Sequence, residues 1–151
     1  MNLFNYEDPA RQAEAGDGLI LRGLSDSDWK SLMEFLDKLQ FPAGAKILRM
    51  GESDRTLYFL QSGQVNVVVD SPRSAKIIAT IGAGSVFGEL AFFDGGPRAA
   101  SIHATADCEL LALSHQAFAK LSLWHPRIAR ELLMELGRVI SARLRRVQAR
   151  G

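Results

Sequence analysis

The chain has 151 residues, of which 47% are hydrophobic and 23% are charged, and its formal net charge is +1. This composition is typical of one globular domain with a sizeable core, and it excludes a disordered chain and a membrane-spanning one. A net charge so close to zero gives no general attraction to nucleic acid or to membranes.

The N-terminal stretch, residues 1–24, is predicted to be an arm outside the main domain. It lacks the basic start and apolar centre of a secretory signal, so we expect a cytoplasmic protein. Its apolar residues come late, between Leu19 and Leu24. We therefore expect the arm to dock near its end onto a single domain formed by residues 25–151.

The main domain is predicted to begin with a helix over residues 26–39. Ser25 followed by Asp28 resembles a capping box, with Asp in place of Glu. Apolar residues then recur at helical spacing, at Trp29, Leu32, Phe35, Leu36 and Leu39. We interpret this stripe as core packing rather than as a cofactor site.

From Phe41 onward the pattern changes to short β-prone runs separated by turns rich in Gly, Ser, Pro and Asp. The runs cover residues 45–50, 56–60, 64–70, 76–81, 101–106 and 109–113. Several short strands at this spacing indicate a sandwich or barrel. Ser62 and Gly63 are expected to form a tight hairpin turn, whereas 70–74 is expected to be a looser, exposed link.

A glycine-rich segment between the fourth and fifth runs is the strongest functional signal. Gly82, Gly84 and Gly88 let a ligand approach the main chain, and a short helix over 89–93 is predicted to follow. The Gly-Gly-Pro turn at 95–97 then brings the chain back toward the same backbone amides. The segment therefore predicts a pocket for a small anion.

Two charged residues of this segment indicate that the anion is part of a nucleotide. The guanidinium of Arg98 matches two oxygens of a phosphate. The carboxylate of Glu89 is suited to accept hydrogen bonds from sugar hydroxyls. Phosphate on Arg98 and ribose on Glu89 together describe a nucleotide. The alternative is a surface turn in which these two side chains merely pair with each other.

The runs Phe-Gly-Glu-Leu-Ala at 87–91 and Pro-Arg-Ala-Ala-Ser-Ile at 97–102 resemble the phosphate-binding cassette of the cyclic nucleotide-binding domain. Protein kinase A regulatory subunits and the catabolite activator family share this domain. We call residues 87–101 the cassette. The resemblance implies a mainly β fold with flanking helices, a double-stranded β-helix or jelly roll with an N-terminal helix, the cassette and a C-terminal helix. The resemblance also implies that Arg98 binds the cyclic phosphate and that Glu89 accepts the ribose 2′-hydroxyl. The remaining ligand contacts implied are Gly88, Leu90, Ala91, Ala99 and Ala100.

Two helices are predicted after the last strand. Ser114 can cap the first, over 115–123, and Pro126 is placed for the first turn of the second, the C-helix of 126–148. In the resembling family the C-helix covers the nucleotide and, in bacterial regulators, forms a dimer seam. Arg143 interrupts the apolar heptad pattern, so a coiled coil is not assured. The family pattern places Gln148 near the base.

The resemblance predicts a sensor of a cyclic nucleotide that signals through movement of the C-helix to a partner. The partner is a second copy of the chain or an unidentified protein effector. Ala99 favours cAMP, because family members that prefer cGMP often carry threonine at this position; cGMP is the alternative ligand. No helix-turn-helix pattern follows the C-helix in this sequence, so we expect a stand-alone module without direct DNA binding.

Two other functions stay open. The first is a protein-interaction or dimerisation module that keeps the fold but binds no ligand. The second is an enzyme on a related jelly roll such as a cupin, which usually carries clustered metal-binding histidines. His103, His115 and His125 form no His-x-His pair, and Cys108 is alone. We therefore expect no metal site and no catalytic residues.

Overall fold

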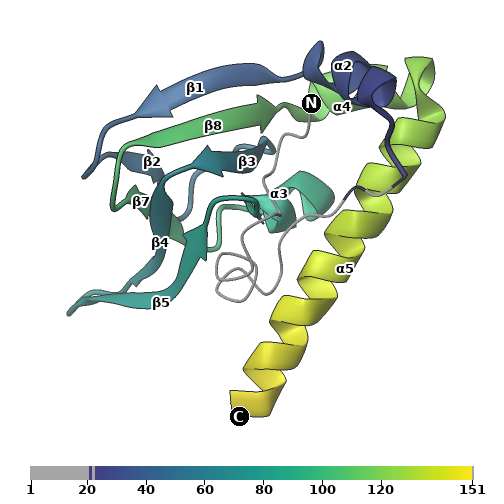
Figure 1. Ribbon diagram of the computed structural model, residues 1–151. Coiled ribbons are helices and arrows are strands. Elements are labelled where there is room, and N and C mark those ends of the chain that lie inside the picture. Colours follow the sequence, from purple (N-terminus) through teal and green to yellow (C-terminus); the bar gives the residue numbers. More distant parts are fainter. Residues whose placement is uncertain (1–20, 22, 151) are drawn as a thin grey trace.

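The computed structural model describes residues 21 and 23–150, which form two four-stranded antiparallel sheets with helices gathered toward one end (Figure 1). The helices are α2 (Asp26–Met33), α3 (Glu89–Asp94), α4 (His115–Trp124) and α5 (Pro126–Arg150). The strands are β1 (Asp37–Phe41), β2 (Lys46–Leu48), β3 (Leu57–Ser62), β4 (Gln64–Asp70), β5 (Ala75–Gly82), β6 (Val86–Phe87), β7 (Ser101–Ala104) and β8 (Cys108–Leu113). This architecture confirms the mainly β fold with flanking helices that the sequence predicts.

The chain passes back and forth between the sheets, whose strand orders are β1-β8-β3-β6 and β2-β7-β4-β5. Apolar side chains from both sheets meet between them. The buried members of this cluster are Leu48, Leu60, Val65, Ile81, Phe87, Ile102, Ala104, Cys108 and Leu110. Alternate residues of each strand point inward, so this core fixes the register of the strands.

A second core joins the helices to the sheet that contains β3 and β8. Leu57 and Leu113 of that sheet are fully buried against Leu32 of α2 and Leu121 of α4. Leu21 belongs to this core and Leu24 packs against it, while residues 1–20 of the expected arm lie outside the described residues. The helices at this end are therefore fixed to the sheet by apolar packing.

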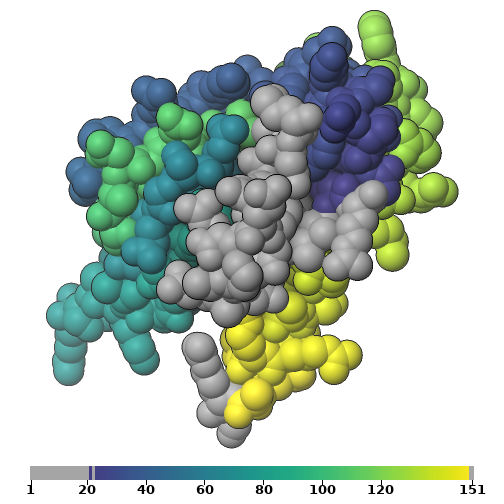
Figure 2. Space-filling model, in the orientation of Figure 1, coloured from purple at the N-terminus to yellow at the C-terminus, as the bar shows by residue number. Residues whose placement is uncertain are grey.

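The long helix α5 is anchored through its first half. Its buried residues recur every three or four positions, at Ile128, Ala129, Leu132, Leu136 and Val139. Within the described part of α5, no side chain after Val139 is buried. Figure 2 shows these last turns at the lower end of the molecule. None of the helices among residues 21 and 23–150 has the length and apolar character to cross a membrane.

The predicted helix over 26–39 is too long. The structure ends it at Met33, and residues 37–41 instead form β1, which pairs with β8 from Asp37↔Ala112 to Phe41↔Cys108. The capping box at Ser25 and Asp28 is present as expected. The apolar spacing of the segment fits a helix locally, but backbone pairing with a strand about seventy residues away decides its structure.

The expected hairpin at Ser62 and Gly63 is also wrong, because β3 and β4 belong to different sheets. Gly63 adopts φ +97°, and a Cβ there would lie 2.4 Å from the carbonyl oxygen of Asp107. The glycine thus permits a close sheet-to-sheet crossing. The true hairpin joins β4 to β5 through 71–74, the segment predicted as a loose link, where Ser71 N–H donates to Ser74 O at 2.8 Å.

Candidate functional site

The cassette begins where β6 ends and the chain turns sharply at Gly88. This residue has φ +80° and precedes α3, which ends at Gly95 with φ +70°. A Cβ on Gly88 would lie 2.7 Å from Nη1 of Arg98 and 3.0 Å from the Thr56 carbonyl oxygen. Gly88 is therefore needed both for its backbone conformation and for the close approach of the Arg98 guanidinium.

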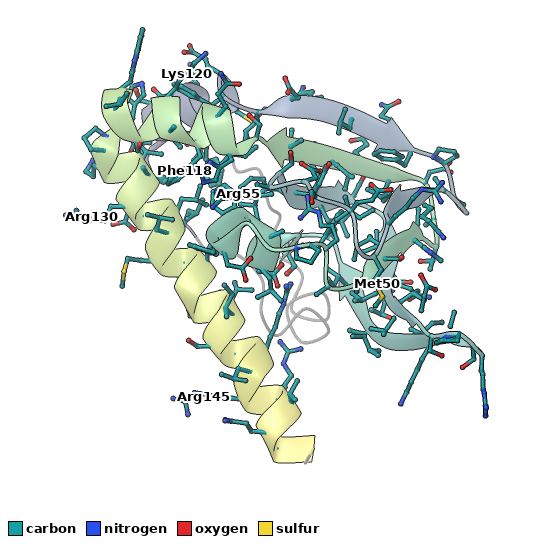
Figure 3. The ribbon with its side chains drawn as sticks, turned by 180° about the vertical axis from the view of Figure 1, so that it is seen from behind. Met50, Arg55, Phe118, Lys120, Arg130 and Arg145 are labelled. Atoms are coloured by element: carbon teal, nitrogen blue, oxygen red, sulfur yellow. The ribbon has the colours of Figure 1, made fainter. Side chains whose placement is uncertain are left out.

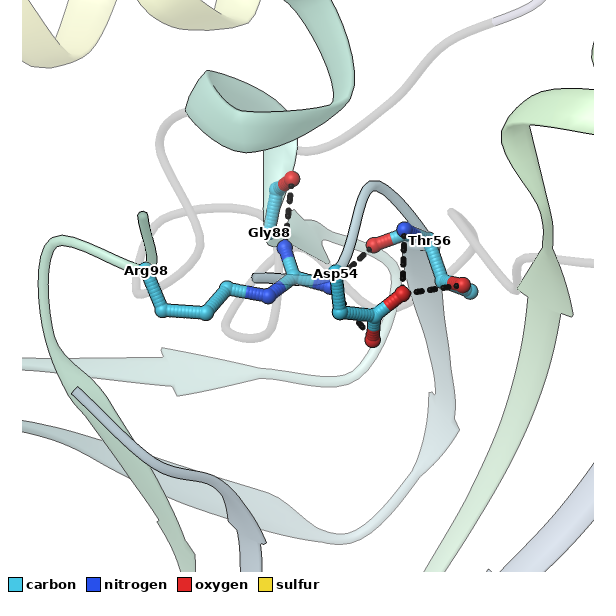
Figure 4. Close-up of polar contacts among 4 residues, drawn as sticks. All are labelled: Asp54, Thr56, Gly88 and Arg98. Atoms are coloured by element: carbon cyan, nitrogen blue, oxygen red, sulfur yellow. Dashed lines mark hydrogen bonds and ion pairs between the residues drawn. The ribbon is translucent and has the colours of Figure 1, made fainter. Parts of the chain in front are cut away.

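Arg98 is the buried cation of the site, with 3% of its side chain exposed. Its Nη1 donates to the Gly88 carbonyl oxygen at 3.0 Å, and its Nη2 donates to the Thr56 carbonyl oxygen at 2.7 Å and to Asp54 Oδ2 at 3.0 Å (Figure 4). Its Cζ lies 5.9 Å from the ring centroid of Tyr58. Three protein acceptors and an aromatic ring hold this guanidinium in place.

The three acceptors do not use all the donors of Arg98. The buried Nε has no hydrogen-bond partner among residues 21 and 23–150. A buried polar atom of this kind is uncommon, because its desolvation is normally compensated by a hydrogen bond. Nε is therefore a donor that an added acceptor would satisfy.

Asp54 supplies the negative charge next to Arg98. Its Oδ1 accepts from Thr56 N at 3.1 Å and from Thr56 Oγ1 at 2.9 Å, so the carboxylate is fixed within the loop before β3. Burial acts to raise the pKa of Asp54, but the hydrogen bonds from Thr56 and Arg98 outweigh it and hold the pKa below its usual value. Asp54 is therefore ionised at neutral pH.

Glu89, the first residue of α3, pairs with Arg143 of α5. Arg143 Nη1 lies 2.9 Å from Glu89 Oε1, and 21% and 12% of the two side chains are exposed. Arg143 Nη2 donates to Ser85 Oγ at 3.0 Å and to the Val86 carbonyl oxygen at 2.6 Å. The pair orients the Glu89 carboxylate, which has further lone pairs to accept hydroxyl donors. It also connects the distal part of α5 to the start of the cassette.

The structure brings Gly88, Glu89 and Arg98 together at the start of α3, and their contacts with a ligand stay predictions. Of the other predicted ligand contacts, Ala91 is buried, Ala100 is half-buried, and Leu90 and Ala99 are exposed. Gln148 is exposed near the end of α5. The base contact expected of Gln148 stays a prediction.

Sequence reasoning missed three participants. Asp54 and Thr56 lie more than forty residues before Arg98 and show no local pattern that would link them to it. Arg143 gave a signal, since it interrupts the apolar pattern of the predicted C-helix. The structure explains that interruption, because this side chain faces the cassette rather than a helix seam.

A third arginine supports the far end of α3. Arg55 Nη2 donates to the carbonyl oxygens of Phe92 and Phe93, both at 3.1 Å, and Figure 3 shows its side chain beside this helix. A cation there complements the C-terminal end of the helix dipole. In the described part of the chain, no group of three His, Cys, Asp or Glu residues is placed to hold a metal ion.

Comparison with known families gives one match of direct relevance. The model of the cyclic nucleotide-binding domain matches residues 38–123, which include the cassette, Asp54 and Thr56. This is more than half of the chain.

Known proteins and structures point in the same direction. The CRP-like cAMP-activated global transcriptional regulator of Mycobacterium tuberculosis is 31% identical over 84% of this chain and 55% of its own length. The cAMP-dependent protein kinase type II regulatory subunit of Drosophila melanogaster is 33% identical over 68% of this chain and 27% of its own length. A cyclic nucleotide-binding domain from Methylobacillus flagellatus superposes with a TM-score of 0.81 and 26% identity, over 93% of this chain and 82% of that one. The chain thus spans about half, or less, of these two curated relatives.

Proposed function

The chain belongs to the cyclic nucleotide-binding domain family, and we propose that it is a sensor module that binds a cyclic nucleotide, with cAMP preferred, and signals through α5. The signal would pass to a second copy of the chain or to another protein. No catalytic role is assigned to the site.

The observation that carries this proposal is the state of Arg98. This arginine is buried and held by three acceptors, and its Nε has no partner among the described residues. A cyclic phosphate would accept from Nε, and Glu89, nine residues before Arg98 and directly after Gly88, would accept from the ribose 2′-hydroxyl. Both roles follow the cassette pattern, and the close approach of the Gly88 backbone to the Arg98 guanidinium supports them.

The preference for cAMP rests on Ala99, next to Arg98. Its side chain is exposed and carries no hydroxyl that could bond the amino group of guanine. The M. tuberculosis relative is named for activation by cAMP. Both observations favour adenine, with cGMP as the alternative.

Signalling through α5 is supported by two features of its distal half. Arg143 forms an ion pair with Glu89, so a ligand that binds Glu89 would alter a contact that holds α5. Large apolar side chains there are exposed, with 56% for Leu144 and 65% for Val147. A ligand that interacts differently with two positions of this helix would shift the equilibrium between them, and a partner could then contact the apolar residues.

A module without ligand is the second candidate. It is favoured by one observation, namely that Nη1 and Nη2 of Arg98 already donate to protein acceptors. Calorimetric titration separates the two candidates. We expect saturable binding of cAMP and weaker affinity for cGMP. In a separate measurement, amide exchange in residues 138–148 should slow when the protein is saturated with cAMP. No heat with either nucleotide would favour the second candidate, and protection of the cassette without protection of 138–148 would contradict the role of α5.

A further inference from the structure

The charges at the site are already balanced before any ligand is considered. Arg98 is paired with Asp54 at 3.0 Å, and Arg143 is paired with Glu89 at 2.9 Å. Two cations and two anions give these four side chains a formal charge of zero. An anionic ligand therefore meets a buried guanidinium whose positive charge is already paired with the carboxylate of Asp54.

The hydrogen bonds of Arg98 indicate that a ligand would join Asp54 rather than replace it. Both protons of Nη2 are used, one by the Thr56 carbonyl oxygen and one by Asp54. A guanidinium has five N–H donors, and three are used by the described residues, which leaves Nε and one proton of Nη1. Asp54 is itself fixed by two hydrogen bonds from Thr56. It would remain close to the ligand phosphate.

We propose that Asp54 is a specificity residue, which makes the site select the singly charged cyclic phosphodiester against doubly charged phosphomonoesters such as AMP. This proposal rests on the proposed function of the site. The reason is electrostatic: the carboxylate of Asp54 repels the ligand phosphate, and this repulsion increases with the number of negative charges on the phosphate. A cyclic phosphodiester carries one such charge, whereas a phosphomonoester carries close to two at neutral pH.

The size of the effect follows from distance and exposure. Anions that share one guanidinium lie within about 6 Å of each other. The side chain of Asp54 is 40% exposed, so solvent screens part of the repulsion even though Arg98 is buried. The second charge of AMP should then weaken its binding on the order of tenfold through Asp54.

The ratio of two dissociation constants isolates this effect. Replacing Asp54 also loosens Arg98, which weakens every phosphate ligand alike, and that common loss cancels when Kd for AMP is divided by Kd for cAMP. Asp54→Asn keeps the size of the side chain and an oxygen that can accept from Thr56. Glu52→Gln is the matched control, since it removes the same charge from the same loop at a side chain that is 57% exposed and pairs with Arg49.

The experiment measures Kd by calorimetry for cAMP, AMP and the 5′-phosphate methyl ester of AMP, which is linear but singly charged. In Asp54→Asn the Kd for AMP divided by the Kd for cAMP should fall on the order of tenfold. The Kd for the methyl ester divided by the Kd for cAMP should not change. Neither ratio should change in Glu52→Gln. In the unmodified protein the methyl ester should bind tighter than AMP, which tests the charge argument without any substitution.

The outcomes separate this inference from the function on which it rests. An unchanged AMP to cAMP ratio in a folded Asp54→Asn variant, or equal changes for AMP and its methyl ester, would overturn the role of Asp54 while cAMP binding stands. An absence of cAMP binding in the unmodified protein would overturn the proposed function itself.

Discussion

Replacing Arg143 with alanine should free the distal turns of α5 while the two sheets stay folded. Beyond Val139 the described side chains of this helix are half-buried or exposed, so apolar packing contributes little there. Arg143 lies in that half and donates to Glu89 of the cassette and to Ser85 and the Val86 carbonyl oxygen just before it. Loss of the Arg143 side chain should therefore lower the free energy of local opening in residues 140–148.

The contacts of Arg143 set the magnitude. Removing one partner of a fully buried ion pair costs about 3–5 kcal/mol. Here the side chains of Arg143 and Glu89 remain 21% and 12% exposed, which lowers the cost because water solvates the partner left behind. We expect the local opening free energy to fall by about 2–3 kcal/mol, which corresponds to opening about 30- to 150-fold more often.

Amide hydrogen exchange measures this opening directly. Peptides from 140–148 should exchange faster by that factor in Arg143→Ala, and peptides from 128–136, which lie in the buried half of α5, should not change. Arg145→Ala is the control, because it removes the same charge two residues away on an exposed side of the helix, which Figure 3 shows pointing away from the sheets. Unchanged exchange in Arg143→Ala, or an equal increase in Arg145→Ala, would refute the link between α5 and the cassette.

Three other substitutions test separate parts of the account. Glu89→Gln should weaken cAMP binding by about 1.5–3 kcal/mol and narrow the affinity gap between cAMP and its 2′-deoxy analogue; an undiminished gap would mean that Glu89 does not contact the ribose. Ala99→Thr should raise the affinity for cGMP relative to cAMP, measured by competition, and a ratio that does not move would count against the adenine assignment. Gly63→Ala should destabilise the fold by about 3 kcal/mol and lower Tm by about 10 °C, because its Cβ would meet the Asp107 backbone at a φ of +97°; a Tm equal to that of the unmodified protein would show that the crossing has room for a Cβ.

The cassette could be predicted from the sequence because its structure is specified locally. Gly88 and Gly95 bound a six-residue helix, and Gly-Gly-Pro supplies the turn before Arg98, so neighbouring residues are enough to predict the short helix and the turn. The same holds for the capping box at Ser25, which the structure contains as expected.

Features decided by distant contacts could not be predicted. β1 forms from a helix-like pattern because Asp37 to Phe41 pairs with β8. Asp54 reaches Arg98 only after β3 and β6 pair side by side, and Arg143 reaches Glu89 only after α5 packs across the helical core. In each case the residue is visible in the sequence, but its partner is far away along the chain, and only the folded structure identifies it.

The central claim is that Arg98 holds the phosphate of a cyclic nucleotide. Calorimetric titration of cAMP into the unmodified protein, Arg98→Ala and Arg98→Lys tests it most directly, with Arg49→Ala as the control because that arginine is 65% exposed. Arg98→Ala should weaken binding by about 2–5 kcal/mol, roughly thirty- to several-thousand-fold, and Arg98→Lys should recover only part, because an ammonium lacks the planar fork. Equal affinity in the unmodified protein and in a folded Arg98→Ala variant would contradict the account.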